Sequence, residues 1–246
     1  MQKTNQTEPE VPSQNEAIHV FRSGSFRSDR RLTKAMGDLL APSYEDATSL
    51  LERELAHCDT LYAYYEGEQL AFFYMTANEN FALDDGQVVP CTYGGLSCAH
   101  EELKNSGAIN KVYCEAFAEQ CVLQEENRQR RLGWATTATP SAYYFSQLVM
   151  EDFVPCLDGS YPPQTIRLAA MLRRANGYPG AAPGDHPFAL RGVAPGTQYS
   201  DSERARIEHV CRKKEFTLFE KLGIDETRGD RLLMFGWLPA PPCASS

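Results

Sequence analysis

The sequence Val88-Val89-Pro90-Cys91-Thr92-Tyr93-Gly94-Gly95-Leu96-Ser97-Cys98-Ala99 decides the fold that this chain is expected to adopt. It is typical of a strand, and the polar segment 100–108 that follows it is typical of a tight turn. A helix is expected from Ile109 to about Arg130, because apolar residues recur there about one helical turn apart. Strand, turn and long helix form the unit to which the other predicted elements are added.

The turn before the predicted helix has the composition of an anion-binding site. The first turn of a helix has unpaired N–H groups, and the helix dipole places about half a positive charge there. Lys104, Asn105, Ser106 and Gly107 are suitable residues for such a site. A single glycine before a helix is equally typical of a plain turn, so both interpretations stay open on this pattern alone.

The composition is that of a globular protein, with 42% hydrophobic and 23% charged residues. A length of 246 residues allows one large domain or two small ones. The net charge of -9 argues against a general nucleic-acid binder, which needs a basic surface. No apolar run reaches the roughly 18 residues of a membrane span, and the N-terminus lacks the pattern of a secretory signal. A cytoplasmic protein without a membrane partner is therefore expected.

The eight cysteines do not form a metal-binding pattern. None of them makes a C-x-x-C pair. Cys91 and Cys98 share the predicted strand, and Cys114 and Cys121 lie on one face of the predicted helix. Without a secretory signal, reduced thiols buried in the fold are expected, and no metal is predicted.

Toward the N-terminus, residues 60–75 are expected to form a β-hairpin whose turn is Glu66-Gly67-Glu68, with apolar and aromatic residues in both arms. Residues 17–22 are expected to form a first strand. Between strand and hairpin we expect two helices, one capped by Ser28-Asp29 and the next by Ser43.

Toward the C-terminus, strands and helices alternate with glycine- and proline-rich loops. The expected elements are strand 133–138, helix 140–148, strand 152–155, helix 164–175, strand 188–191, helix 200–222 and strand 230–238. The charged run 124–131 is interpreted as a solvated helix end. The long loop 178–200 is expected to cover a site or to wrap the domain.

These elements predict one domain over residues 17–240. Its last part, residues 155–240, is expected to be an extension that completes the sheet or covers it, with strand 230–238 favouring completion. Residues 1–16 are polar and cannot bury enough apolar surface to offset chain entropy, so a disordered tail is predicted there.

The turn and its surroundings resemble the GCN5-related N-acetyltransferase (GNAT) superfamily. In that family a strand ends at a turn of the form Arg/Gln-x-x-Gly-x-Gly/Ala, and Lys104-Asn105-Ser106-Gly107-Ala108-Ile109 is similar to it. Lys104 replaces the usual Arg or Gln, and Ile109 stands where a small residue is expected. The resemblance extends over residues 17–155 and includes the family's second and third strands, its fifth strand and the helix after it: residues 60–75, 133–138 and 140–148.

The resemblance implies an α/β (α+β) fold with a mixed, mostly antiparallel central sheet flanked by helices. It also implies an enzyme that moves an acyl group, expected to be acetyl, from acyl-coenzyme A to an amine of a small molecule by direct attack on the thioester. Main-chain N–H groups of Leu96, Ser97, Cys98 and Ala99 would then hold the thioester. The turn Lys104 to Ile109 would bind the pyrophosphate.

The family often carries a catalytic tyrosine on the helix after the fifth strand, as the acid for the leaving thiol. Alignment on Pro140-Ser141-Ala142 places Ser146 at that position. Tyr143 and Tyr144 are neighbours on the same helix and are candidates to replace it. Successive residues point about 100° apart around the axis, and packing is the more ordinary role for both tyrosines.

Two further side chains could take part in the chemistry. His100 could act as a base near neutral pH, although a histidine in a surface turn is more ordinary. Cys98 suggests a covalent acyl-enzyme, but no base accompanies it in the sequence.

Other functions also stay open. An acyl carrier protein could present the thioester, since its pantetheine arm brings a single phosphate, and Arg167, Arg173 and Arg174 are candidates for the basic patch that would bind it. A non-catalytic GNAT-like binding protein is favoured by Ser146 in place of the tyrosine. A homodimer is a further option, and a nucleic-acid partner is not expected.

Overall fold

The computed structural model describes residues 16–105, 107–182 and 184–239. One sheet runs through it in the order β1-β2-β3-β4-β5-β8-β6, with β7 also paired to β8. The strands are β1 (Glu16–Phe21), β2 (Thr60–Glu66), β3 (Gln69–Ala82), β4 (Val88–Ala99), β5 (Leu132–Thr137), β6 (Glu151–Val154), β7 (Ala189–Leu190) and β8 (Arg231–Trp237). The β4–β5 pair is parallel and the other pairs are antiparallel, which confirms the mixed, mostly antiparallel sheet.

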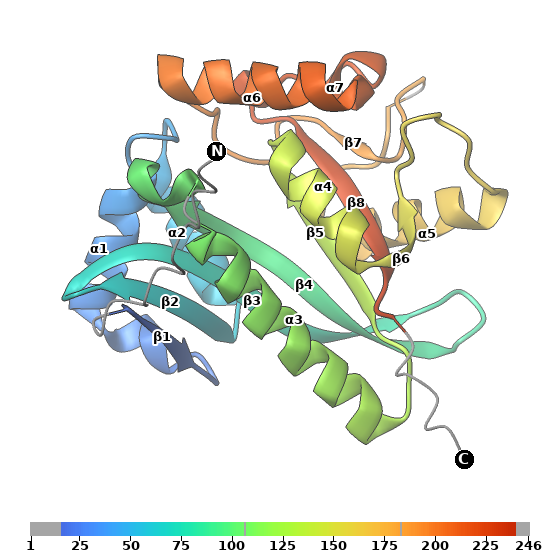
Figure 1. Cartoon of the computed structure of the whole chain (residues 1–246). Helices are drawn as coiled ribbons and strands as arrows, with labels where there is room; N and C mark the ends of the chain where they lie inside the picture. Colours follow the sequence, from blue (N-terminus) through green and yellow to red (C-terminus); the bar gives the residue numbers. More distant parts are fainter. Residues whose placement is uncertain (1–15, 106, 183, 240–246) are drawn as a thin grey trace, which may run out of the picture.

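Helices cover both faces of the sheet (Figure 1). Helix α3 (Ala108–Asn127) packs on β2 and β3 from one face, and α1 (Arg30–Leu40) and α2 (Ala47–His57) pack on β3 and β4 from the other. The remaining helices are α4 (Pro140–Val149), α5 (Pro163–Ala175), α6 (Asp201–Lys214) and α7 (Leu218–Lys221), with short 3-10 turns η1 (Ser25–Ser28), η2 (Glu101–Asn105) and η3 (Glu226–Arg228).

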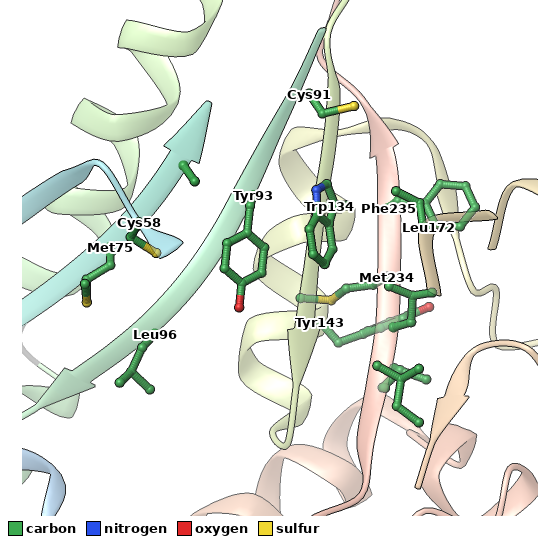
Figure 2. Packing of buried hydrophobic residues seen from close by; sticks show 14 of the residues in the cluster. Cys58, Met75, Cys91, Tyr93, Leu96, Trp134, Tyr143, Leu172, Met234 and Phe235 are labelled. Atoms are coloured by element: carbon green, nitrogen blue, oxygen red, sulfur yellow. The ribbon is translucent and has the colours of Figure 1, made fainter. Parts of the chain in front are cut away.

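Alternate residues of the central strands belong to two separate apolar clusters, one on each face of the sheet, because successive side chains of a strand point to opposite faces. The larger cluster includes Phe73 and Met75 of β3 and reaches α1, α2 and α5. The smaller one lies under α3 and includes Phe72 and Val112. Figure 2 shows Tyr93 of β4 beside Trp134 of β5 within the larger cluster, where their ring centroids are 4.4 Å apart. Both faces of the central strands are therefore covered by apolar packing.

The hairpin and the strand–turn–helix unit form as predicted. Gly67 makes the hairpin turn with a φ of 61°, a conformation that favours glycine. Asp29 caps α1 by accepting from the main-chain N–H groups of Arg31 and Leu32. The cap of the next helix was predicted wrongly: Asp46, not Ser43, accepts the N–H of Ser49, so α2 starts at residue 47.

The single helix predicted over residues 200–222 is wrong as well. Helix α6 ends where Glu215 adopts a left-handed φ of 52°, and the separate turn α7 follows. The break turns Phe216 and Leu218 into the apolar core, where both are buried. One continuous helix would not have directed both of these side chains inward, so burial overrides the local helical pattern.

The charged run 124–131 is only in part a solvated helix end. Arg131 is buried, and its guanidinium donates to Asn78 Oδ1 at 2.7 Å and to the carbonyl of Cys91 at 2.9 Å. Burial lowers its pKa. Arg131 thus ties the start of β5 to β3 and β4, where the pairing of β4 with β5 begins.

The predicted disordered tail, residues 1–16, lies outside the described residues except for residue 16, which starts β1. Within the described ranges, no helix combines the length and the apolar character needed to cross a membrane. Strand β8 inserts between β5 and β6, so the C-terminal part of the chain contributes a central strand to the sheet.

Candidate functional site

The parallel pair β4–β5 separates halfway along its length. Cα partners run from Cys91 with Leu132 to Gly94 with Ala135, and no described residue pairs the two strands beyond that point. Strand β4 continues beside β3 to Ala99, and β5 continues beside β8 to Thr137. The edge of β4 that faces away from β3 therefore carries main-chain groups without a strand partner, and such groups must meet a ligand, water or side chains.

A β-bulge lies at the point of separation. Tyr74 is opposite Ser97, but Thr76 is opposite Gly94, so Met75 faces both Gly95 and Leu96. Gly95 is needed there because an added Cβ would lie 2.7 Å from Cys58 Sγ and 3.0 Å from Glu54 Oε2. Bulges re-aim main-chain groups and are common at active sites. Here the bulge brings the backbone of β4 against a carboxylate of α2.

Two hollows meet at this place. The inner cavity, of about 210 Å³, runs between the separating strands and touches both faces of the sheet. The outer cleft, of about 430 Å³, extends from the end of β4 to the start of α3 and to α6. Both are lined by the same set of residues at their junction: Tyr44, Ser97, Tyr113, Thr139, Ala142 and Phe145.

Glu54 provides a carboxylate on the α2 side of the inner cavity. The residue is 4% exposed, and its Oε2 accepts a hydrogen bond from the Tyr93 hydroxyl at 3.1 Å. Burial, with the negative charge of Glu54 next in importance, raises the pKa of Tyr93 well above its usual value. Tyr93 therefore stays a hydrogen-bond donor and orients Glu54 together with Arg53, whose Nη2 lies 3.4 Å from Glu54 Oε1.

Glu54 was missed in the sequence reasoning, although a signal for it was present. Leu50, Leu51 and Leu55 define the apolar face of α2, and Glu54 lies three to four residues from the first two, on that same face. A carboxylate on a buried helix face is uncommon unless it is paired or functional.

Two hydroxyl groups lie on the opposite, α3, side of the sheet. Tyr113 and Ser97 share a hydrogen bond of 2.8 Å between Oη and Oγ. The Tyr113 ring packs on Tyr74 and Phe145, with centroids 4.8 and 4.7 Å away. Burial raises the pKa of Tyr113, which keeps its hydroxyl protonated at neutral pH. Tyr113 was not among the sequence candidates, because a tyrosine in the middle of a long helix carries no motif.

The three candidates on α4 separate in space. Ser146 is buried and lines the inner cavity. Tyr143 points to the other side of the helix, where its hydroxyl donates to the carbonyl of Pro155 at 2.8 Å. Tyr144 donates to the carbonyl of Lys214 at 3.1 Å and packs on Phe216. Neither tyrosine lines either hollow, so their placement favours the packing role.

The four predicted main-chain donors lie along the two hollows. Leu96 and Ser97 line the inner cavity, and Ser97, Cys98 and Ala99 line the outer cleft. The thiol of Cys98 points to α1, where Sγ lies 3.2 Å from the Leu39 carbonyl. Burial raises the pKa of this thiol to about 11, which disfavours a covalent acyl-enzyme.

The predicted phosphate turn opens on the outer cleft. Gly107 precedes α3 with a φ of 77°, is exposed, and lines the cleft together with Ile109 and Asn110. Ala108, the first residue of α3, is buried. Ser106 lies outside the described residues. His100 donates its main-chain N–H to Ala71 and lines neither hollow.

Lys104 has a partner that the sequence did not suggest. Its ammonium forms an ion pair with the carboxylate of Glu203 in the first turn of α6, with both side chains largely buried. The Nη2 atom of Arg206 lies 3.9 Å from Oε1 of the same Glu203 carboxylate, and Arg206 also lines the outer cleft. A phosphate that used Lys104 would have to displace Glu203.

The basic patch predicted for a carrier protein is wrong in one member. Arg173 is buried, and its guanidinium donates to the carbonyls of Pro179, Pro187 and Ala189. Arg167 and Arg174 are exposed. Arg173 thus fastens the loop after α5 and is not available at the surface.

Solved structures that resemble this chain include members of the GNAT family. No family model matches the sequence, and no curated protein is similar to it. A protein from Enterococcus faecalis described as "Probable N-Acyltransferase" is 18% identical with a TM-score of 0.41, over 56% of this chain and 33% of that one. The chain therefore spans about a third of that protein's length.

Two further structures cover more of their own chains. A GNAT family acetyltransferase from Elizabethkingia anophelis with acetyl-CoA bound is 14% identical with a TM-score of 0.37, over 61% of this chain and 86% of that one. The ribosomal-protein-S18-alanine N-acetyltransferase from Escherichia coli is 8% identical with a TM-score of 0.41, over 94% of this chain and 99% of that one. Values this low do not by themselves assign a function.

In residues 16–105, 107–182 and 184–239, no three His, Cys, Asp or Glu side chains gather as a metal site would require. The charged groups at the inner cavity are instead one carboxylate and two guanidinium groups: Glu54, Arg53 and Arg231.

Proposed function

We propose that this protein is an acyl-CoA-dependent N-acyltransferase that moves an acyl group, acetyl in the first instance, directly to an amine of a small molecule. One observation carries the proposal: the inner cavity passes between β4 and β5, with the Glu54 carboxylate on one side of the sheet and the Tyr113 and Ser97 hydroxyls on the other. A base and an acid on either side of unpaired main-chain donors are what acyl transfer to an amine needs.

In the proposed reaction, the amine enters from the α2 side and its nitrogen attacks the thioester carbonyl carbon. The proton lost by the nitrogen passes to Glu54, directly or through one water. Main-chain N–H groups on the free edge of β4 stabilise the negative charge on the carbonyl oxygen. The C–S bond then breaks, and the leaving thiolate, whose conjugate thiol has a solution pKa near 8.5, takes a proton from the Tyr113 hydroxyl. Solvent then removes the proton from Glu54 and returns one to Tyr113. Ser146 is the alternative acid, since it lines the same cavity.

The donor would lie along the outer cleft. The free N–H groups at the start of α3, at Ile109 and Asn110, are suited to the diphosphate of coenzyme A, and both residues line the cleft. The Glu203 carboxylate beside Lys104 opposes that charge, because two anions cannot share the lysine without a cost. This observation supports a second candidate donor, an acyl carrier protein, whose pantetheine arm brings a single phosphate in place of the diphosphate.

The acceptor would be small, because the inner cavity is about 210 Å³ and its lining includes Tyr178, Val193 and Ala194 of the C-terminal region. An amino group on a large partner could not reach Glu54 through this space without moving that region. We also expect the protein to act in the cytoplasm, where acyl-CoA and its acceptors are dissolved.

Two measurements test the proposal. Calorimetry with acetyl-CoA should show binding at micromolar to millimolar ligand, and a thiol-release assay with a panel of small amines should show turnover. Glu54→Gln should retain acetyl-CoA binding and lose turnover, whereas Glu52→Gln, an exposed position on the same helix, should retain both. No binding at millimolar acetyl-CoA rejects the free donor, and turnover with a loaded carrier protein would then select the second candidate.

A further inference from the structure

The inner cavity carries an excess of positive charge on the side where the acceptor would enter. Among its lining residues, the charged ones are Arg53, Glu54 and Arg231. With all three ionised, the lining has a net charge of +1 (two cations and one anion). A cavity that took only a simple amine, itself a cation before it loses its proton, would not benefit from two guanidinium groups.

Arg231 is the more unusual of the two arginines. It is 5% exposed, and its guanidinium donates to the carbonyls of Asp230 at 2.7 Å, Pro195 at 2.9 Å and Glu226 at 3.4 Å. Within the described part of the chain, no carboxylate approaches it closely enough for an ion pair. The hydrogen bonds to carbonyls use Nη1 and Nη2 and leave the Nε–H group without a hydrogen-bond partner among the described residues. Carbonyl groups also do not neutralise the charge, so a buried cation remains at the cavity wall.

Arg53 adds a second cation nearby. Its Nη1 donates to the carbonyl of Val193 at 2.7 Å, and its Nη2 lies 3.4 Å from Glu54 Oε1. Burial above all lowers the pKa of Arg231, and the positive charge of Arg53 acts in the same direction. Two like charges that face one space repel each other, and an anion between them removes the repulsion.

A comparison within the chain separates this arrangement from an ordinary structural arginine. Arg173 is also buried and also donates to three carbonyls, but it lines neither the inner cavity nor the outer cleft. Arg231 differs in facing the cavity and in having a second guanidinium there. Hydrogen bonds to loop carbonyls are enough to explain why Arg173 is buried. They do not explain why Arg231 lies at the inner cavity.

We propose that the acceptor of this enzyme carries a carboxylate as well as an amine, as α-amino acids do, and that Arg53 and Arg231 bind the carboxylate. This inference rests on the proposed acyl transfer. The amine then lies toward Glu54 and Gly95, where the carbonyl carbon of the donor is attacked. A guanidinium presents paired N–H donors that match the two oxygens of a carboxylate, and charge-assisted bonds of this kind are strong. The apolar wall formed by Leu50, Trp134 and Met234 is left for the acceptor's side chain.

Matched acceptor pairs test the inference. Alanine and ethylamine, leucine and 3-methylbutylamine, and phenylalanine and 2-phenylethylamine differ only by the carboxylate. The wild-type protein should acylate at least one amino acid with kcat/KM about tenfold or more above that of its amine, in line with a charge-assisted hydrogen bond. Arg53→Gln, at a half-exposed side chain, should reduce this preference by raising KM for the amino acid more than KM for the matching amine.

Two further variants sharpen the result. Arg231→Lys keeps the positive charge and should retain part of the preference, whereas Arg231→Gln should lose it. Arg212→Gln, on the exposed face of α6, is the charge-matched control and should behave as the wild type. Equal rates for amino acids and amines, or a preference that survives Arg53→Gln and Arg231→Gln together, would overturn the inference.

Binding measured without turnover keeps the two proposals distinguishable. Calorimetry with the same amino acids and amines should show that the wild-type protein binds the amino acid more tightly than the amine. Arg53→Gln should bind the amino acid less tightly than the wild type does. If neither member of any pair is acylated but the amino acid still binds in this way, acyl transfer fails and the carboxylate site stands. If acylation occurs without a carboxylate preference, acyl transfer stands and the carboxylate site fails.

Discussion

At the scale of single residues, the proposed chemistry depends first on Glu54. The carboxylate is buried, is oriented by Tyr93 and lies 3.0 Å from where a side chain on Gly95 would begin. Glu54→Gln keeps the shape and removes the proton acceptor, so kcat/KM should fall about 100-fold or more while the fold is retained. Steady-state kinetics of thiol release, with circular dichroism for the fold, measure this. A variant with unchanged kcat would show that Glu54 is not the base.

Tyr113 and Ser146 are the two candidates for the acid that protonates the leaving thiolate, and two variants distinguish them. Tyr113→Phe removes the hydroxyl that bonds Ser97 and should lower kcat about tenfold to 100-fold, with little change in KM for the donor. Ser146→Ala, measured beside it, should have the smaller effect, since no described side chain orients the Ser146 hydroxyl. The opposite order would assign the acid to Ser146, as the resemblance implies.

Gly95 links the backbone of β4 to this chemistry. A Cβ on it would lie 2.7 Å from Cys58 Sγ, 3.0 Å from Glu54 Oε2 and 3.1 Å from the Met75 carbonyl. Gly95→Ala should therefore lower the free energy of unfolding by about 1–3 kcal/mol and should displace Glu54, with loss of activity. Urea denaturation measures the first effect. Gly180→Ala, where a Cβ would meet nothing within 4 Å, is the control and should leave the unfolding midpoint unchanged.

At the scale of elements, the Lys104–Glu203 ion pair and the Ser202–Glu101 hydrogen bond join α6 to the turn that is predicted to bind phosphate. No residue of α6 is buried, and the Lys104–Glu203 pair joins its first turn to η2. Glu203 is ion-paired with Lys104 and would compete with a phosphate for its ammonium group. Glu203→Gln should therefore lower the Kd for acetyl-CoA about twofold to fivefold. Calorimetry measures this, with Glu208→Gln on the exposed face of α6 as the control. Weaker binding by Glu203→Gln would mean that the phosphates lie elsewhere.

Most elements followed from local pattern, and the errors have a common cause. Local patterns predicted the hairpin, the strand at residues 88–99 and the helix after Gly107. These patterns are alternating apolar residues, a glycine at a turn and helical spacing, and each involves residues that are close together in the sequence. The break at Glu215 and the cap at Asp46 depend on where Phe216, Leu218 and α2 can be buried. Burial is a property of the assembled fold, so these boundaries could not be predicted from neighbours in sequence.

At the scale of the whole molecule, stability should depend on pH through His57. Its Nε2 lies 2.9 Å from Glu79 Oε1, and that hydrogen bond is the main cause that raises the pKa of His57 above 6.5. A raised folded-state pKa contributes stability that is fully present below 6.5 and is lost as pH rises through the higher folded value. Because the pair is partly exposed, the effect is expected to be small.

Urea denaturation from pH 6 to pH 8.5 measures that loss of stability. His57→Gln should remove the His57 part of the slope, and Glu79→Gln should remove it as well by taking away the partner. An unchanged slope in both variants would show that other groups set the pH dependence in this range.

The resemblance to a known family implied the mixed sheet, whereas the sequence by itself determined the order of the elements and the strand, turn and helix that surround the site. These follow from the periodicity of apolar residues and from glycine at the turns, which act within a few residues along the chain. Of the residues that the resemblance proposed for the site, Leu96 to Ala99, Gly107 and Ser146 line the inner cavity or the outer cleft. Only the tertiary structure brought Glu54, Arg53 and Arg231 to one cavity, placed Tyr113 on Ser97, and set Glu203 against Lys104. Those groups lie on different elements, and their meeting depends on how the helices and loops pack on the separating strands.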